Sequence, residues 1–80
     1  MFIEIITVEK KLYSGEIKLV QVPGSKGSFE ILKNHAPIIS TLEKGRIKVL
    51  DMEGKQEFFE INSGVIEAAN NKIVVLAEVV

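Results

Sequence analysis

Short runs in which apolar and polar residues alternate make up most of this 80-residue chain. In Gly45–Asp51, for example, Ile47 and Val49 face one side of an extended segment, and Arg46 and Lys48 face the other. Such period-two alternation with β-branched residues is typical of strands that have one buried face. Runs of this kind predict strands at 2–8, 16–22, 45–51, 56–62, 65–69 and 72–80. In the second run, Ile17 and Leu19 are predicted to share a side.

Residues that suit tight turns separate these runs. Asn70-Asn71 predicts a two-residue hairpin loop, and Asp51–Gly54 predicts a longer one. Ser14-Gly15 and Asn62–Gly64 are predicted as turns because such residues tolerate a positive φ. Short strands joined in this way predict one all-β domain over residues 1–80, a β-sandwich or flattened barrel with essentially no helix.

Composition limits both the core and the class of partner. A chain of this size buries roughly 60% of its unfolded surface, so an apolar content of 46% is high and predicts an exposed docking face. With no cysteine, neither a disulfide nor a thiolate site is available. A net charge of −1, with acidic and basic residues interspersed, argues against nucleic acid or anionic lipid as the main partner.

Targeting signals are not recognisable in the sequence. No apolar run approaches the roughly 20 residues of a membrane span. The start, Met1-Phe2-Ile3-Glu4, lacks the basic segment of a signal peptide, and Glu4 interrupts its apolar residues. The chain is therefore expected to be cytosolic.

The least regular stretch, Pro23–Pro37, is the candidate for chemistry because it holds glycines, a lysine and the single histidine. A phosphate-binding loop would need a second glycine five residues after Gly24, but Phe29 stands there, and no helix is predicted to follow. Gly24 and Gly27 also fail to complete a dinucleotide-binding motif. We expect no cofactor in this loop.

His35 could act as a general base, since its intrinsic pKa lies near neutrality. A nucleophilic triad would also need an activated serine and an orienting carboxylate, but the sole aspartate, Asp51, lies in a predicted hairpin loop. One histidine with scattered glutamates is too few donors for zinc. We expect no catalytic or metal site, and a packing or contact role for His35.

The polar side chains of this stretch are instead predicted to form a contact surface. They are Lys26, Ser28, Glu30, Lys33 and His35. Ser28 and Glu30 are two residues apart, so they share a face if the segment is extended. Pro37 favours an extended conformation at the residue before it.

Several short motifs resemble the epsilon subunit of F-type ATP synthases, and in particular its N-terminal β-sandwich domain. They are Tyr13-Ser14-Gly15, Gly24–Gly27, Asn34–Pro37, Gly64-Val65 and Lys72–Ala77. Each motif is short, but their order and spacing together are specific, and the likeness extends from about Phe2 to Glu78. The resemblance implies a sandwich of about ten strands in two five-stranded sheets.

The resemblance also implies a function. The subunit would be a non-catalytic part of the central stalk that links the gamma subunit to the membrane c-ring, in a complex with the alpha and beta catalytic subunits. Proton-driven rotation would thereby be coupled to ATP synthesis at the cytoplasmic face of the bacterial inner membrane. On this analogy Ser28, Glu30 and His35 face the ring. The residues that would face gamma are Thr7, Ser40, Arg46, Asn62, Ser63, Gly64, Val65, Ile66 and Glu67.

Some positions depart from the family pattern. The family often has an acidic residue where Ser28 stands and glycine where Glu30 stands, which suggests a carboxylate moved two residues along the same face. Lys33 replaces a common proline, and Arg46 replaces an often apolar residue. Many relatives also continue into a C-terminal helical hairpin. Because this chain stops at Val80, we expect neither hairpin-based inhibition nor a nucleotide site.

Two other classes remain as alternatives. A lipoyl- or biotinyl-type carrier domain is also all-β and of similar length, and its modified lysine would be Lys55 in Met52–Lys55. The neighbours that such carriers have around that lysine are missing here. A small hydrolase would depend on His35, with little else in the sequence to support it.

Overall fold

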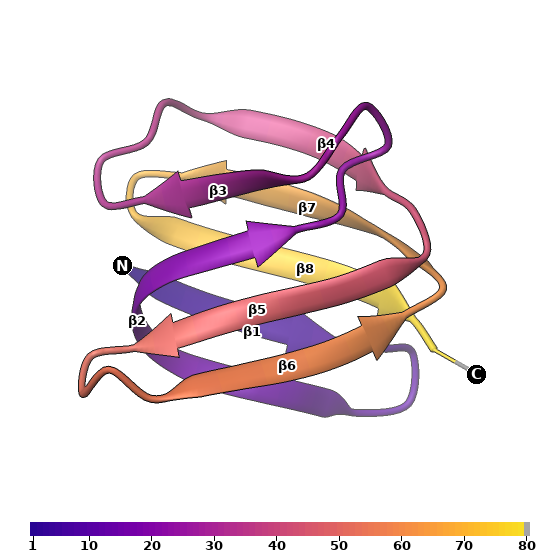
Figure 1. The fold of residues 1–80 in the computed structure, drawn as a ribbon, viewed down its shortest axis with the longest axis horizontal. Helices are drawn as coiled ribbons and strands as arrows, with labels where there is room; N and C mark the ends of the chain where they lie inside the picture. The colour runs from indigo at the N-terminus through magenta and orange to yellow at the C-terminus, as the bar shows by residue number, and fades with distance from the viewer. Residues whose placement is uncertain (80) are drawn as a thin grey trace.

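The computed structural model of the chain describes residues 1–79, and all regular elements among them are strands. The all-β prediction is therefore confirmed. Figure 1 shows the strands wrapped into a flattened sandwich. The strands are β1 (Phe2–Ile6), β2 (Lys11–Val22), β3 (Phe29–Leu32), β4 (Ile38–Leu42), β5 (Gly45–Asp51), β6 (Gln56–Ile61), β7 (Ser63–Ala69) and β8 (Lys72–Glu78).

Two layers share the long strand β2. We call the layer ordered β4-β7-β8-β1-β2 the first sheet, and the layer ordered β3-β2-β5-β6 the second sheet. The layers thus hold five and four strands, and eight separate strands replace the expected ten. The two layers add up to one more than the number of separate strands because β2 runs through both without a break.

The bend in β2 corrects two predictions. Gly15, expected in a turn with Ser14, lies within the strand and pairs with Ile3. Near Ile17 the strand passes from β1 to β3 and β5, with a register shift between Ile17 and Leu19. This bulge reverses the alternation, so Ile17 and Val20 are buried while Leu19 is only half-buried on the outer face. The expectation that Ile17 and Leu19 share a side was wrong.

The core between the sheets is entirely apolar among the described residues. Its fully buried large side chains are Ile3, Ile5, Ile17, Ile31, Ile47, Ile66, Ile73, Val20, Val22, Val49 and Val75. Alternation places them correctly in most strands, as with Ile47 and Val49 in β5. Branched side chains with few accessible rotamers pack such an interior densely, which makes it resist deformation.

The turns agree with the sequence in part. Asn70 and Asn71 form the predicted hairpin loop with φ of 52° and 60°, and Gly54 ends the Asp51 loop with φ of 87°. Between β6 and β7 only Asn62 lies outside a strand, because the chain crosses directly from the second sheet to the first. At the end of the chain, β8 stops at Glu78, and the predicted extension to Val80 includes a residue outside the described ones.

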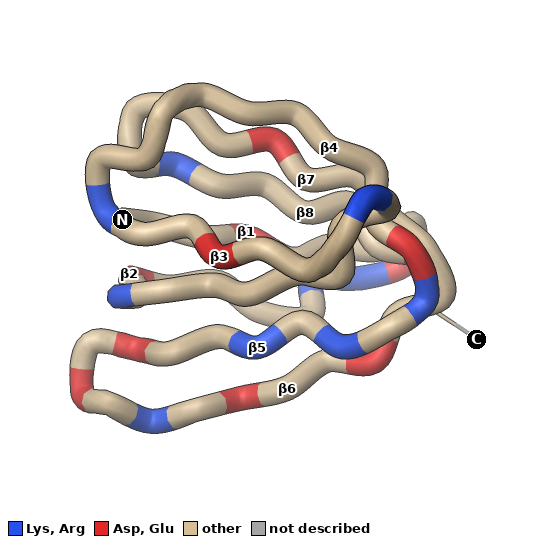
Figure 2. Tube along the Cα trace, turned by 45° about the horizontal axis from the view of Figure 1, so that its top comes forward, with Lys and Arg blue, Asp and Glu red and all other residues tan. Residues whose placement is uncertain are grey.

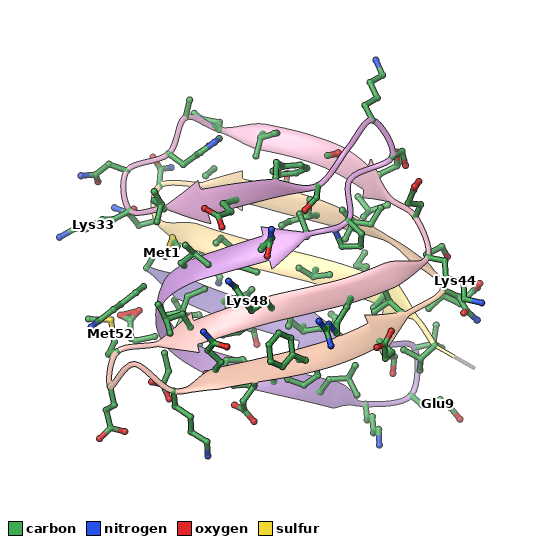
Figure 3. The ribbon with its side chains drawn as sticks, in the orientation of Figure 1. Met1, Glu9, Lys33, Lys44, Lys48 and Met52 are labelled. Atoms are coloured by element: carbon green, nitrogen blue, oxygen red, sulfur yellow. The ribbon has the colours of Figure 1, made fainter. Side chains whose placement is uncertain are left out.

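The sandwich has two ends, which Figure 3 identifies. Met1, Lys33 and Met52 lie at one end, here called the N-terminal end, together with the β7–β8 turn. Glu9 and Lys44 lie at the opposite end. Acidic and basic residues are interspersed along most of the trace in Figure 2, although β4 carries none.

Candidate partner-binding surfaces

The predicted ring-facing residues follow the edge strand β3 and do not gather in one loop. Ser28 directly precedes β3, Glu30 lies within it, and His35 follows it in the β3–β4 loop. All three side chains are exposed, and Glu30 points away from the core because its neighbour Ile31 is buried. β3 runs toward the N-terminal end (Figure 1), so Ser28 comes before the strand at its far end and His35 comes after it, closer to the N-terminal end. Only a partner that extends along this edge could contact all three.

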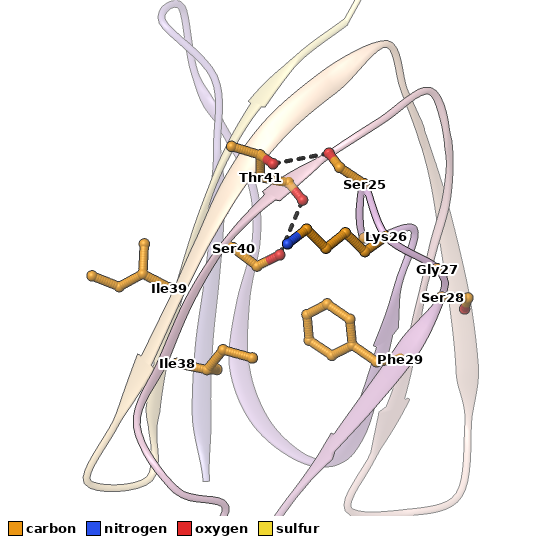
Figure 4. Close-up of a pocket in the computed structure, with 10 residues that line it drawn as sticks. Ser25, Lys26, Gly27, Ser28, Phe29, Ile38, Ile39, Ser40 and Thr41 are labelled. Carbon is orange, nitrogen blue, oxygen red and sulfur yellow. Dashed lines mark hydrogen bonds between the residues drawn. The ribbon is translucent and has the colours of Figure 1, made fainter.

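A groove of about 680 Å³ lies between the β2–β3 loop and β4 (Figure 4). It is lined by residues 24–29 and 38–41. The loop is fastened to β4 by two hydrogen bonds: the Thr41 hydroxyl donates to Ser25 Oγ at 2.9 Å, and the Ser25 N–H donates to the Thr41 carbonyl at 3.1 Å. Gly24 is required there, since a Cβ on it would lie 2.6 Å from the Gly27 carbonyl oxygen. The expected contact loop is thus ordered.

His35 is held by hydrogen bonds to backbone carbonyls of nearby residues. Its Nδ1 donates to the carbonyl oxygen of Ala36 at 2.6 Å, and its N–H donates to the Leu32 carbonyl at 3.1 Å. Because a carbonyl oxygen only accepts, the first bond places the proton on Nδ1 in the neutral ring and leaves Nε2 as the acceptor. This arrangement suits a contact residue. No carboxylate orients the ring among the bonds of the described residues, as a catalytic triad would require.

The β3–β4 loop is also attached to the β7–β8 turn. Asn34 donates its backbone N–H to Asn71 Oδ1 at 2.7 Å, and Asn71 Nδ2 donates to Asn34 Oδ1 at 3.0 Å. Asn34 has a left-handed backbone with φ of 65°. Neither asparagine was predicted to belong to a site.

The predicted gamma-facing residues do not share one face. Val65 and Glu67 lie on the outer face of the first sheet, in β7, where they alternate with buried residues. Arg46 lies on the outer face of the second sheet, with its guanidinium 4.4 Å from the centre of the Phe58 ring. Ser40 is half-buried in β4 beside the groove. The two outer faces point in opposing directions, so Arg46 and Val65 cannot contact one flat partner surface together.

Structural roles account for three members of that set. Thr7 closes the β1–β2 turn, where its Oγ1 donates to the Lys10 carbonyl and accepts the Lys10 N–H, each at 3.1 Å. Gly64 allows β7 to approach β8, since a Cβ would lie 2.7 Å from the Leu76 carbonyl oxygen. Ile66 is 0% exposed, so its side chain belongs to the core and not to the surface on which it was predicted.

Asn62 and Ser63 lie at the corner between β6 and β7. The Asn62 N–H donates to the Glu78 carbonyl at 2.8 Å, and the Ser63 hydroxyl donates to Glu78 Oε1 at 3.5 Å. Both side chains are half-buried at the opposite end of the sandwich. Asn62 and Ser63 therefore lie beside the outer face of the first sheet, next to the start of β7.

Most of an apolar surface on that face was not predicted from the sequence. The patch, called the outer apolar patch below, consists of Ile39, Val65, Val74 and Leu76, with Glu67 at its border. Ile39 is 72% exposed and Leu76 is 54% exposed. The sequence of β8 contained an indication of this patch. Its run Ile73–Ala77 is apolar at every position, which is typical of a strand that is covered on both faces.

Tyr13, in the first half of β2, lies away from these surfaces. Burial raises the pKa of Tyr13, and the negative charges of Glu57 and Asp51 raise it further. Within residues 1–79 there is no group of three histidine or acidic side chains placed to hold a metal ion. The same residues include no helix with the length and apolar character to cross a bilayer.

Known proteins resemble the chain over almost all of its length. It is 38% identical over 78 residues to the ATP synthase epsilon chain of Campylobacter hominis, in a match that covers 96% of this chain and 60% of that protein. It is 33% identical over 78 residues to the ATP synthase epsilon chain of Alkalilimnicola ehrlichii, covering 98% and 56% respectively. The chain thus spans less than two thirds of the length of these relatives.

Solved structures share the fold at low sequence identity. A chain of the Euglena gracilis mitochondrial ATP synthase, solved with its OSCP, F1 and c-ring parts in rotational state 1, superposes with a TM-score of 0.88 at 13% identity, covering 94% of this chain and 48% of that one. A chain from the central stalk and c-ring of the Tetrahymena thermophila mitochondrial enzyme gives 0.81 at 14%, covering 98% and 63%. Residues 1–80 also match the family described as the ATP synthase Delta/Epsilon chain, beta-sandwich domain. The chain belongs to this family.

Proposed function

We propose that the chain is the β-sandwich of a non-catalytic central-stalk subunit that connects the gamma subunit to the c-ring of an F-type ATP synthase, in one complex with the alpha and beta subunits. Rotation of the ring would reach gamma through this domain without any bond-making step in it. The two relatives are ATP synthase epsilon chains, and the outer apolar patch supplies a surface that the chain alone leaves uncovered.

The outer apolar patch is the proposed gamma-binding surface. The patch is continuous over β4, β7 and β8 because its residues pair across the strands. Val65 pairs with Leu76, and Glu67 pairs with Ile39 and Val74. Exposed apolar area of this kind is stabilised by a partner that removes it from water. Val65 and Glu67 keep their predicted gamma-facing role, and Asn62 and Ser63 border the same face. Arg46, on the opposing face, fits this surface poorly.

The edge along β3 is the proposed ring-facing surface. Glu30 is the one carboxylate among the three predicted ring-facing residues, and Ser28 and His35 flank it with polar groups at the two ends of β3. Polar and charged groups at the border of an interface set its orientation and partner choice. A strip of this shape suits a row of loops on a ring, with Glu30 near its centre.

Stiffness is the property that the proposed role requires. The described core contains no buried polar group and is closed on both open sides of the sandwich by side-chain and backbone contacts. Dense apolar packing has low compressibility and transmits force with little loss. The domain would therefore move as one body between two partners.

Leu76→Glu and Leu32→Glu test the gamma-binding surface as a matched pair. Leu76 is 54% exposed in the outer apolar patch, and Leu32 is 53% exposed on the outer face of the second sheet. The expected result is that L76E loses at least tenfold in affinity for purified gamma, about 1.4 kcal/mol, while L32E retains wild-type affinity. Equal affinities, measured by calorimetry on folded variants, would place gamma elsewhere.

Glu30→Lys tests the ring-facing strip, with Glu60→Lys as its control. Both glutamates are exposed on the outer face of the second sheet, but Glu60 lies on β6, away from the β3 edge. E30K is expected to weaken attachment of the assembled stalk to c-ring vesicles and to leave gamma binding unchanged, whereas E60K preserves ring attachment. Loss of gamma binding in E30K would mean that the two faces are assigned wrongly.

The proposed location follows from the proposed partners. A domain held against the c-ring would be peripheral to the membrane, and for a bacterial enzyme it would lie at the cytoplasmic face of the inner membrane. Family membership leaves the carrier alternative without an observation in its favour. An unmodified mass for Lys55 in protein purified from cells would agree with this.

A further inference from the structure

Asn34 and Asn71 form a reciprocal clamp between two turns that are 37 residues apart in the sequence. The Asn71 side chain accepts the Asn34 N–H at 2.7 Å and donates to the Asn34 side chain at 3.0 Å. The Asn71 backbone carbonyl also accepts the N–H of Phe2 at 2.9 Å. One residue of the β7–β8 turn thus contacts both the β3–β4 loop and the start of β1.

The turn itself does not require the Asn71 amide. In a two-residue hairpin loop, the second position needs a left-handed backbone, and glycine provides it as well as asparagine does. Asn71 has a φ of 60° and Asn70 a φ of 52°. The carboxamide of Asn71 therefore matters through its bonds to Asn34 and not through the local conformation.

The β3–β4 loop has few other attachments. Residues 33–37 form no strand ladder, and their side chains are exposed. Within the loop the His35 N–H donates to Leu32, and the His35 ring bonds only to its neighbour Ala36. The two bonds to Asn71 are the ones that tie residue 34, next to His35, to the body of the domain.

We infer that Asn71 is a positioning residue for ring attachment: it fixes the β3–β4 loop in the conformation that presents His35 to the c-ring. This inference rests on the proposed function. The β7–β8 turn belongs to the first sheet, whose outer face carries the outer apolar patch. The clamp therefore joins the proposed ring-facing strip directly to the sheet proposed to bind gamma, so that force applied to the loop enters that sheet.

Asn71→Gly and Asn70→Gly test the clamp. Both changes preserve the left-handed turn, but only N71G removes the side-chain bonds to Asn34. In the folded chain, N71G is expected to raise the hydrogen-exchange rate of the Asn34 amide about tenfold. In the assembled stalk, it is expected to weaken attachment to c-ring vesicles several-fold, with gamma affinity unchanged. N70G should match the wild type throughout.

Asn71→Asp separates the two bonds. A carboxylate still accepts the Asn34 N–H but no longer donates to Asn34 Oδ1, so exchange and ring attachment should fall between those of wild type and N71G. Equal amide exchange in N71G and N70G would overturn the clamp. Faster exchange with unchanged ring attachment would overturn its positioning role. If wild-type stalk does not attach to the ring, the proposed function fails, and the exchange comparison alone decides the clamp.

Discussion

The rings of Tyr13 and Phe59 pack edge to face, with centroids 5.7 Å apart and planes inclined at 62°. Tyr13 lies in the first half of β2, at one edge of the first sheet, and Phe59 lies in β6, at one edge of the second. These two edges are not paired by a backbone ladder among the described residues. The aromatic pair therefore closes one open side of the sandwich, while the contact of Gly24 with Leu42 closes the other.

A double-mutant cycle should detect this closure. Tyr13→Leu and Phe59→Leu each keep much of the apolar volume but remove the edge-to-face geometry. We expect a coupling free energy of about 0.5–1.5 kcal/mol in urea unfolding. If the two changes in unfolding free energy are additive, the pair stabilises the fold only through the apolar area that each ring buries.

The same tyrosine should make stability fall in alkali. Its pKa is raised by burial, by Glu57 and by Asp51, so the folded chain keeps its phenol proton where the unfolded chain loses it. The stabilising contribution is present below about pH 10 and is lost as pH rises through the raised folded pKa.

Tyr13→Phe provides the comparison for that prediction. Between about pH 9 and about pH 11, its free energy of unfolding should decline less than that of the wild type. As Tyr13 is the only tyrosine and tryptophan is absent, phenolate absorbance reports its titration directly. If the free energy of unfolding falls equally in the wild type and in Tyr13→Phe, the loss of stability in alkali is not caused by Tyr13.

Gly64→Ala should destabilise the domain, whereas Gly15→Ala should not. A Cβ at Gly64 would lie 2.7 Å from the Leu76 carbonyl oxygen, so β7 and β8 must separate, at a cost of about 1–3 kcal/mol. At Gly15 the nearest atom is the Tyr13 hydroxyl at 3.7 Å, an ordinary contact, so the change should stay within about 0.5 kcal/mol. Urea unfolding of both variants measures the difference.

Asp51→Ala should weaken the β5–β6 hairpin. One carboxylate oxygen of Asp51 accepts the N–H groups of Glu53 and Lys55, at 2.8 Å and 2.9 Å. Losing both bonds at an exposed site should cost about 1 kcal/mol, and Asp51→Asn should recover most of it because an amide oxygen remains as acceptor. Equal stability of the two variants in thermal unfolding would rule out this role.

The sequence predicted the fold well where each residue's environment is local. Alternation located β5 and β6 and assigned most of their buried residues, because Ile47, Val49 and Ile61 alternate with charged residues. Asn70-Asn71 was identified because few residues tolerate two successive left-handed conformations. The bulge near Ile17 was missed, since an extra residue in a strand depends on the partners across the sheet.

The candidate surfaces were predictable only in part. Glu30 and His35 are exposed as expected, but the sequence could not show that Ser28 and His35 lie at opposite ends of β3. Ile66 was assigned to a surface by resemblance, although the alternation of β7 places it in the core. Arg46 was grouped with Val65, yet the two lie on opposing faces.

By itself the sequence determined the strands other than β3 and β4, most of the buried side chains and the family, because period-two patterning and short motifs are local properties of the chain. Tertiary structure alone decided which exposed apolar residues join in one patch, and which turns touch. Ile39 and Leu76 share the outer face of the first sheet through strand pairing, and Asn34 meets Asn71 across 37 residues. Such contacts depend on how β2 curls from one sheet into the other, and that curl is set by packing between the sheets.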